Sequence, residues 1–491
     1  MKKVDHKKLN ELIQHEMKES DRKFNEEMPH ITLERVDYNF EDCTFYDRKS
    51  LHMVIKNEGL TKSNVDIIFH DSIKKERDND IMDGNSNNSM LVHRQVSKLH
   101  ELSQWVAIFP QHKERVEPGA SFTAEVSTCF NPKILSRFNK ERLIEDFLIV
   151  RCLNGNDKFA TISCNYKPTI MGISLRALTT LNETNESFEK CDQHRLIHEI
   201  EHEIDEFEKN LNTLFSLNIK NFSNVIQREN AARYVLNNSS DYTKPSQSND
   251  SSKNTKSSKS LSSSISIEHI PSLPQSMLQV YKRSFEHLRE DIIDRDKYFN
   301  SDLSSEYVFL MEHLINRCKT NLNSSLSDEE QKLSSEASIN TDNSNLTIEE
   351  QKNLALFYLS SKNFSDFEKS NFELELLAEI LNDLLISFPQ PLIPTRYLDF
   401  CSYTHNCYEE ATSLFVYLPK SHFKLFEMIV KFLQIYLKCL SSCDTNFHSI
   451  LADAMFQLNN NGRNDRVNLK NKTPIEFLKL FLDHHINFKY I

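Results

Sequence analysis

LLAEILNDLLISFPQPLIPTRYLDFC, residues 376–401, is the stretch that determines the fold predicted for the second half of the chain. Its apolar residues keep a helical spacing up to Phe388, where Pro389-Gln390-Pro391-Leu392 follows. Proline has no backbone N–H and disfavours a helical residue before it, so the helix must stop there and an extended turn begins. Tyr417-Leu418-Pro419 then opens a long amphipathic helix over residues 421–438.

Helical spacing of apolar residues continues on both sides of this stretch. It predicts an all-α domain over residues 303–491, in which a polar loop covers 324–347. The predicted helices are 305–320, 349–359, 372–387, 408–417, 420–441, 446–458 and 474–485.

The apolar period changes to two in the first third of the chain. Apolar residues alternate with their neighbours over 51–56, and the same period recurs over 122–126. Several short strands with no long helix between them predict an all-β sandwich over residues 30–175. A polar segment, 74–92, is predicted to be a disordered insertion in one loop. The remaining predicted strands are 31–38, 64–69, 105–109, 146–152 and 158–165.

Two helical segments flank the sandwich. Residues 6–28 place Leu9, Ile13 and Met17 on one stripe before Pro29 ends the run, which predicts an N-terminal helix within residues 1–29. Residues 194–217 carry apolar residues at heptad-like spacings of three and four. That seam either joins two copies of the chain or packs on a neighbouring element, and we favour packing because the run is short.

The segment 176–302 as a whole is predicted to be a helical and disordered linker. Residues 237–266 consist of Ser, Asn, Lys and Asp with almost nothing apolar. Such a segment cannot bury enough surface to offset its chain entropy and is predicted to be a flexible tether.

Composition excludes several classes of function. The 491 residues include only 6 glycines, so no glycine-rich nucleotide-binding loop and no G-x-S-x-G elbow can be written. A net charge of -12 argues against general binding to nucleic acid. No apolar run reaches the roughly 18 residues of a membrane span, and the N-terminus lacks a signal sequence. The scattered cysteines complete no zinc ligand set, so neither a metal nor a cofactor is predicted.

These motifs resemble those of one known family. The helix closed by the prolines at 389–391 and the Leu-Pro at 418–419 resemble the RhoGAP fold. Residues 53–59 (MVIKNEG), the Val-Glu-Pro-Gly turn at 116–119 and the strand 156–166 (NDKFATISCNY) resemble the ASH type of immunoglobulin-like domain. In this order they resemble the C-terminal module of the Lowe-syndrome (oculocerebrorenal) type of inositol polyphosphate 5-phosphatases, without the phosphatase domain.

The sequence departs from this family where GTP hydrolysis would be accelerated. A RhoGAP places an arginine finger, on a loop of pattern G-x-x-R-x-x-G, against the charge of the transferring phosphoryl group. The corresponding region, residues 320–347, contains neither glycine nor arginine. The family's Lys and Arg on the preceding helix fall at Asn382 and Ile386, and its Asn falls near Leu451. We therefore predict a catalytically dead RhoGAP-like domain with no catalytic residue.

The resemblance implies a surface for Rab GTPases on the last sandwich strand and the N-terminal helix. An edge strand has unpaired backbone groups that can extend a partner's sheet. Phe159, near Thr161, is the predicted anchor, and the alternative is a core role for Phe159. His15, Glu16 and Glu19 are predicted to face the partner while the apolar stripe of their helix covers the sandwich.

Together these inferences predict a non-catalytic adaptor. Its predicted partners are Rab GTPases, with Rac and Cdc42 as further candidates, and short peptides of endocytic adaptors. It is predicted to be cytoplasmic and held on endosomal and Golgi membranes through protein partners. Three alternatives stay open: an active Rho GTPase-activating protein, the C-terminal part of an inositol polyphosphate 5-phosphatase, and a structural protein that dimerises through residues 194–217.

Overall fold

A computed structural model of the chain describes two compact units, each made of two separate parts of the sequence. The first unit joins residues 1–199 to 320–389, and the second joins 200–319 to 390–491. The predicted all-α domain, 303–491, therefore contributes to both units, and the predicted domain boundaries stay a prediction. The residues described are 13–20, 28–69, 105–110, 114–132, 135, 143–183, 191–239, 273–289, 292, 297–327, 346–439, 447–457 and 473–483.

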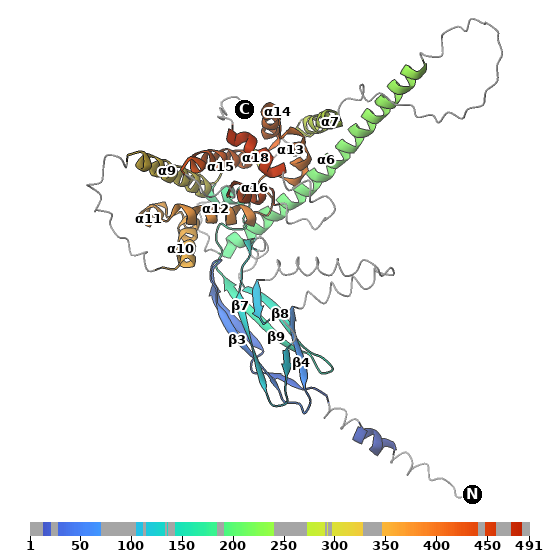
Figure 1. The fold of residues 1–491 in the computed structure, drawn as a ribbon, viewed down its shortest axis with the longest axis vertical. Coiled ribbons are helices and arrows are strands. Elements are labelled where there is room, and N and C mark those ends of the chain that lie inside the picture. The colour runs from blue at the N-terminus through green and yellow to red at the C-terminus, as the bar shows by residue number, and fades with distance from the viewer. Residues whose placement is uncertain are drawn as a thin grey trace, which may run out of the picture. The chain divides into compact units, whose positions relative to one another are not determined.

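The first unit contains the predicted all-β sandwich, built from two sheets (Figure 1). Its four-stranded sheet has the order β1-β3-β7-β5, and its five-stranded sheet has the order β2-β9-β8-β4-β6. All strand pairs are antiparallel except β2 with β9, which run parallel. The strands are β1 (Ile31–Leu33), β2 (Asp37–Cys43), β3 (Ser50–Asn57), β4 (Ser63–Phe69), β5 (Val106–Phe109), β6 (Glu114–Val116), β7 (Ser121–Thr128), β8 (Leu143–Cys152) and β9 (Lys158–Tyr166).

The period-two pattern places one set of side chains between the sheets. Phe40, Trp105, Phe130 and Tyr166 are buried and in ring contact, with centroids 5.3–6.0 Å apart. The strand predicted over 31–38 is wrong in one respect, because residues 34–36 interrupt it and its halves join different sheets.

The predicted turn at 116–119 is confirmed. Gly119 adopts φ +72°, a conformation that glycine reaches without the steric cost of a Cβ, and Ala120 N donates to Glu117 O over 3.0 Å. The turn therefore connects β6 directly to β7.

Four helices that follow the sandwich in sequence lie wholly within the first unit, and polar contacts attach the sandwich to two of them. Tyr46 Oη, in the β2–β3 loop, donates to Asp383 Oδ2 over 2.8 Å. Just after the last sandwich strand, β9, the backbone N–H groups of Ile170 and Gly172 donate to the buried hydroxyls of Ser360 and Ser387, respectively. These helices are α5 (Leu175–Glu183), α10 (Ile348–Ser360), α11 (Phe364–Lys369) and α12 (Leu374–Ser387).

The half-buried carboxyl of Asp383 predicts a pH dependence of stability. Burial raises its pKa above the usual range, so the folded state binds this proton more tightly than the unfolded state. Asp383 therefore contributes stability at low pH that is lost as the pH rises from its unfolded to its folded pKa. Compared with an Asp383→Asn variant, the wild type should lose free energy of unfolding as the pH rises from about 4.

Asp366 provides a control of opposite sign. Hydrogen bonds from Lys369 and Asn363 lower the pKa of this exposed carboxyl. Relative to an Asp366→Asn variant, the wild type should gain stability as the pH rises through the same range. Urea unfolding of the three proteins between pH 3.5 and 7 measures both trends. If the free energy of unfolding changed with pH equally in Asp383→Asn and in the wild type, the prediction for Asp383 would be contradicted.

Helices are the regular elements of the second unit among its described residues, and the 49-residue helix α6 is the longest of them (Figure 1). Its helices are α6 (Cys191–Ser239, whose first turns belong to the first unit), α7 (Leu273–Leu288), α8 (Lys297–Asn300), α9 (Ser305–Ser327, which ends in the first unit), η5 (Thr395–Tyr397), α13 (Leu398–Thr404), α14 (Tyr408–Thr412), η6 (Ser413–Tyr417), α15 (Lys420–Cys439), α16 (Phe447–Phe456) and α18 (Thr473–Asp483).

Several predicted helix boundaries are wrong. α6 runs far beyond the predicted 194–217, and α9 enters the predicted polar loop by four residues. α7 lies within the segment 176–302, which was predicted to be a helical and disordered linker, and that domain assignment stays a prediction. Most of the heptad-like seam of α6 is buried inside the chain, with Ile204 and Leu211 at most 1% exposed and Leu214 42% exposed, so packing within the chain accounts for most of it. Segments 74–92 and 240–266 lie outside the described residues.

The proline turn that ends α12 leads into a segment held by one stripe of α6. Gln390 Nε2 donates to Asp205 Oδ1 over 2.8 Å. One helical turn further along, Arg396 Nη1 donates to Glu208 Oε2 and, over 3.3 Å, to Asn212 Oδ1. The side chains of Arg396 and Glu208 are only 3% and 10% exposed. This buried ion pair therefore fixes the segment against α6.

Candidate partner-binding face of the sandwich

The outer surface of the five-stranded sheet carries an apolar patch. Strand register places Phe159 of β9, Ile149 of β8 and Ile68 of β4 side by side in one row that points away from the core. Phe147 lies in the next row, opposite Thr161. Phe159 and Phe147 are 60% and 51% exposed, and Ile149 at the centre is 3% exposed. We call these four apolar residues the sheet patch.

The outer surface of the four-stranded sheet is different. His52 and Lys56 of β3 alternate with core residues, and Thr123 and Glu125 lie opposite that strand on β7. Phe109 of β5 is an exposed aromatic residue on this surface, with 73% of its area exposed. It lies opposite Glu125 of β7. An outward surface of polar residues is what an antiparallel sheet facing water normally shows, so the sheet patch is the exception in this sandwich.

The exposure of Phe159 decides between the two roles predicted for it. Its side chain is solvent-exposed rather than part of the core, whereas Thr161, two residues further along β9, is half-buried. Both residues lie on the outward surface, so the structure brings them together as predicted. Their role in binding a partner stays a prediction.

The predicted edge position of β9 is wrong. β9 pairs with β2 on one side and with β8 on the other, so its backbone groups are already used. The outer strand beside it, β2, is blunted, because Lys49 Nζ donates to Phe40 O and Asp42 O and Glu41 adopts a positive φ. A lysine at the strand edge and a local break in the strand geometry both hinder the addition of another strand. Side chains of the sheet surface, rather than backbone hydrogen bonds, are therefore available for a partner.

Part of the N-terminal helix is described, over residues 13–20. Ile13 and Met17 are 45% and 61% exposed, so these residues of the apolar stripe do not cover the sandwich as predicted. His15 and Glu16 are exposed as well, whereas Glu19 is half-buried and has a partner within the chain. Leu9 lies outside the described residues.

The degenerate GAP positions contain no cation. Asn382 and Ile386 lie one turn apart on α12 in the first unit, both half-buried, and Leu451 is fully buried on α16 in the second. Of the region expected to hold the finger, residues 328–345 lie outside the described residues. Arg396, which follows the proline turn, is buried and bound to Glu208, so its guanidinium does not reach solvent.

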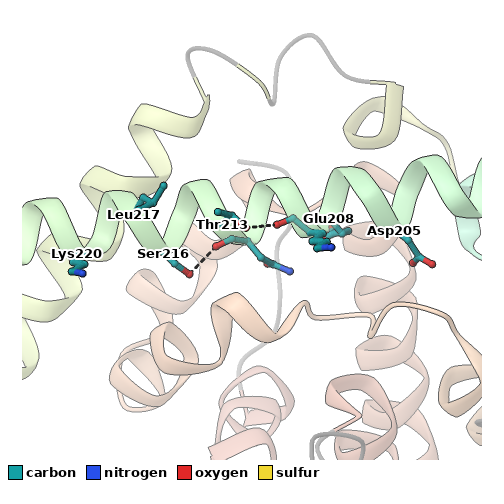
Figure 2. Close-up of a pocket in the computed structure, with 8 residues that line it drawn as sticks. Asp205, Glu208, Thr213, Ser216, Leu217 and Lys220 are labelled. Carbon is teal, nitrogen blue, oxygen red and sulfur yellow. Dashed lines mark hydrogen bonds between the residues drawn. The ribbon is translucent and has the colours of Figure 1, made fainter.

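A hollow of about 630 Å³ runs along α6 in the second unit (Figure 2). Two carboxylates and two ammonium groups line it, and one of the carboxylates, Glu208, is already paired with Arg396. The Thr213 and Ser216 hydroxyls donate to the helix carbonyls of Lys209 and Asn212. No predicted site residue lines the hollow. Its described lining residues are Asp205, Glu208, Lys209, Asn212, Thr213, Ser216, Leu217 and Lys220.

Neither a metal-binding cluster nor a membrane-spanning helix is found in the part of the chain that the structure describes. No three His, Cys, Asp or Glu side chains gather there in a group able to hold a metal ion. None of its helices is both long enough and apolar enough to cross a bilayer.

The N-terminal sandwich is similar to ASH and PapD-like β domains of solved structures. PapD-like domain 7 of human CEP192 matches 28% of this chain and 87% of its own length, at 8% identity and a TM-score of 0.19. The C. elegans MSP family member WR4 matches 28% of this chain and 97% of its own, at 8% identity and a TM-score of 0.16. The E. coli chaperone DraB matches 28% of this chain at 9% identity and a TM-score of 0.17.

The chain spans only 55% of the length of that chaperone. No family model matches the chain, and no curated protein matches it. Identities and TM-scores this low concern the β domain alone and say nothing of what this chain binds. The resemblance to RhoGAP domains and to the Lowe-type phosphatases stays a prediction.

Proposed function

We propose that the protein is a non-catalytic adaptor that binds a small GTPase of the Rab type on the outer surface of its five-stranded sheet. The sheet patch carries the proposal, because exposed aromatic side chains beside a buried isoleucine are what protein interfaces use as anchors. Phe159 and Thr161, the residues that the family resemblance assigns to Rab binding, both lie on that surface.

Two observations support a non-catalytic role. Catalysis of GTP hydrolysis needs a mobile, solvent-facing cation that reaches the γ-phosphoryl group. The positions that match the family's cations are an amide and an aliphatic side chain, Asn382 and Ile386. The buried arginine near the proline turn is already bound to a carboxylate. Adaptor peptides and Rac or Cdc42 remain proposed partners of the helical part, and endosomal and Golgi membranes remain the proposed location.

Removing the aromatic anchors should weaken binding strongly. The full-length protein is titrated against a panel of Rab GTPases loaded with a GTP analogue or with GDP. For a Rab that binds, Phe159→Ala and Phe147→Ala should each lower the affinity by about thirty-fold, since a central interface aromatic contributes about 2 kcal/mol or more.

Phe109→Ala is the matched control, because it removes an equally exposed aromatic from the other sheet. It should leave the affinity unchanged. A Rab whose affinity falls equally in all three variants, or a panel in which no Rab binds, would refute the proposal. Single-turnover hydrolysis with Rac, Cdc42 and Rho tests the non-catalytic role, and an acceleration above about 100-fold would overturn it.

A further inference from the structure

Two unpaired carboxylates lie beside the sheet patch. Asp37 of β2 lies in the same cross-strand row as Thr161 and Phe147, and Glu145 of β8 lies one row further on, two residues from Phe147. Both side chains are exposed and point outward with the patch. Neither makes an ion pair with any of the residues that the structure describes.

Two other carboxylates on this surface lie beside a residue of opposite charge. Asp66 of β4 lies directly opposite Arg151 of β8, in the row on the far side of the patch. Asp42 of β2 pairs with Lys167 over 3.1 Å and accepts from Asn165 Nδ2. The sheet patch is therefore bordered by a neutral row at one end and by two uncompensated carboxylates at the other.

We propose that the partner of this surface presents an apolar area bordered by two cationic side chains that meet Asp37 and Glu145. This inference rests on the proposed function, because it specifies the chemistry of the partner at the same site. Opposite charges across an interface raise the association rate and suppress wrong partners, whereas like charges facing each other cost several kcal/mol. A partner with acidic residues around its apolar area is thereby excluded.

Strand geometry gives the spacing of the two cations. β2 and β8 are separated by β9, which places them about 9.6 Å apart across the sheet. One row along the strands adds roughly 6.8 Å in the perpendicular direction. The carboxylates are thus anchored about 12 Å apart, and the partner's Lys or Arg side chains should have a similar spacing.

Charge reversal on the full-length protein tests the inference. The first probes are two synthetic amphipathic helical peptides with the same leucine face, one with lysines and the other with glutamates on its polar face. The affinity for the lysine peptide should fall at least about tenfold in the double variant Asp37→Lys/Glu145→Lys. In the neutral variant Asp37→Asn/Glu145→Gln it should fall about threefold, which is half of that change on a logarithmic scale. It should also fall in Phe159→Ala. The glutamate peptide should not bind the wild type.

A matched control separates a local effect from the overall negative charge. Glu125→Lys/Glu229→Lys makes the same change in net charge at exposed positions on the other sheet and on α6. It should leave the lysine peptide's affinity within about twofold of wild type at physiological salt, where the Debye length is about 8 Å. Equal losses in the control and the reversal variant, or equal binding of both peptides, would overturn the inference.

The Rab panel keeps this test distinct from that of the proposed function. A Rab that depends on Phe159 but binds Asp37→Lys/Glu145→Lys as tightly as wild type refutes the charge inference and leaves the proposed function standing. If no Rab binds while the lysine peptide shows the expected losses, the proposed GTPase is refuted and the inferred partner chemistry stands.

Discussion

Replacing Arg396 by alanine is expected to lower the free energy of unfolding of the second unit by about 3–5 kcal/mol. The substitution leaves the Glu208 carboxylate buried without its cation, and an unpaired buried charge costs far more than a lost surface contact. Urea unfolding monitored by far-ultraviolet circular dichroism measures the loss. A change below about 1 kcal/mol would show that water reaches Glu208.

The double variant Arg396→Met/Glu208→Leu tests whether the loss comes from the unpaired charge, because it removes both charges together. Arg396 Nε and Nη2 and Glu208 Oε1 have no hydrogen-bond partner among the described residues, so the pair recovers only part of its desolvation cost. Apolar side chains of similar volume should therefore restore most of the stability or exceed the wild type. Arg195→Ala, which breaks the exposed pair with Glu199, is the surface control and should cost less than about 1 kcal/mol.

Replacing Phe285 by alanine is expected to cost about 3–5 kcal/mol. Phe285 is fully buried on α7, stacked on Phe215 of α6 at 4.8 Å and on Tyr417 at 4.6 Å. Tyr397 and Phe400 complete the ring contacts, at 5.0 and 5.6 Å. Truncation removes apolar contact area and leaves a cavity that rigid aromatic neighbours cannot fill.

This second prediction also tests the organisation of the chain. If residues 176–302 formed the predicted linker, a substitution at Phe285 would leave the stability of the helical unit unchanged. Phe357→Ala is the control, since that side chain is 54% exposed on α10 and should cost much less. Thermal unfolding of the two variants beside the wild type distinguishes these outcomes.

The sandwich was predictable because alternation of apolar residues follows directly from the geometry of a half-buried strand. β3, β7 and β9 lie within one or two residues of their predicted bounds. The order of the strands in each sheet was not predictable, because a strand's own sequence does not record its neighbours. β9 was therefore placed at an edge although it lies between β2 and β8.

The sheet patch was predictable only in part. In β8 both alternating sets contain apolar residues, so the period does not show which set faces the core. Phe147 and Ile149 were missed for that reason, whereas the alternation in β9 is clear enough to place Phe159 and Thr161 together. The signal that indicates an outward Phe147 is its position an even number of residues from Glu145 and Arg151, which are polar and face outward.

The extension of α6 beyond Leu217 was not predicted, for a different reason. Beyond Leu217 its residues are mostly polar and exposed, so no apolar stripe marks the helix. α7 was not assigned to the helical unit, because the polar segment 237–266, predicted to be a tether, separates it from the heptad-like residues of α6. Contacts such as Phe215 with Phe285 arise only once distant parts of the chain have met, and local spacing carries no information on them.

The division of the chain into interleaved units has a consequence for its synthesis. Domains usually fold one after another as they leave the ribosome. Here the first unit needs residues up to 389, which are translated only after residues 200–319 of the second unit have emerged. Neither unit can be completed before the other has been largely translated. A premature stop codon anywhere before residue 389 would therefore leave both of them unfinished.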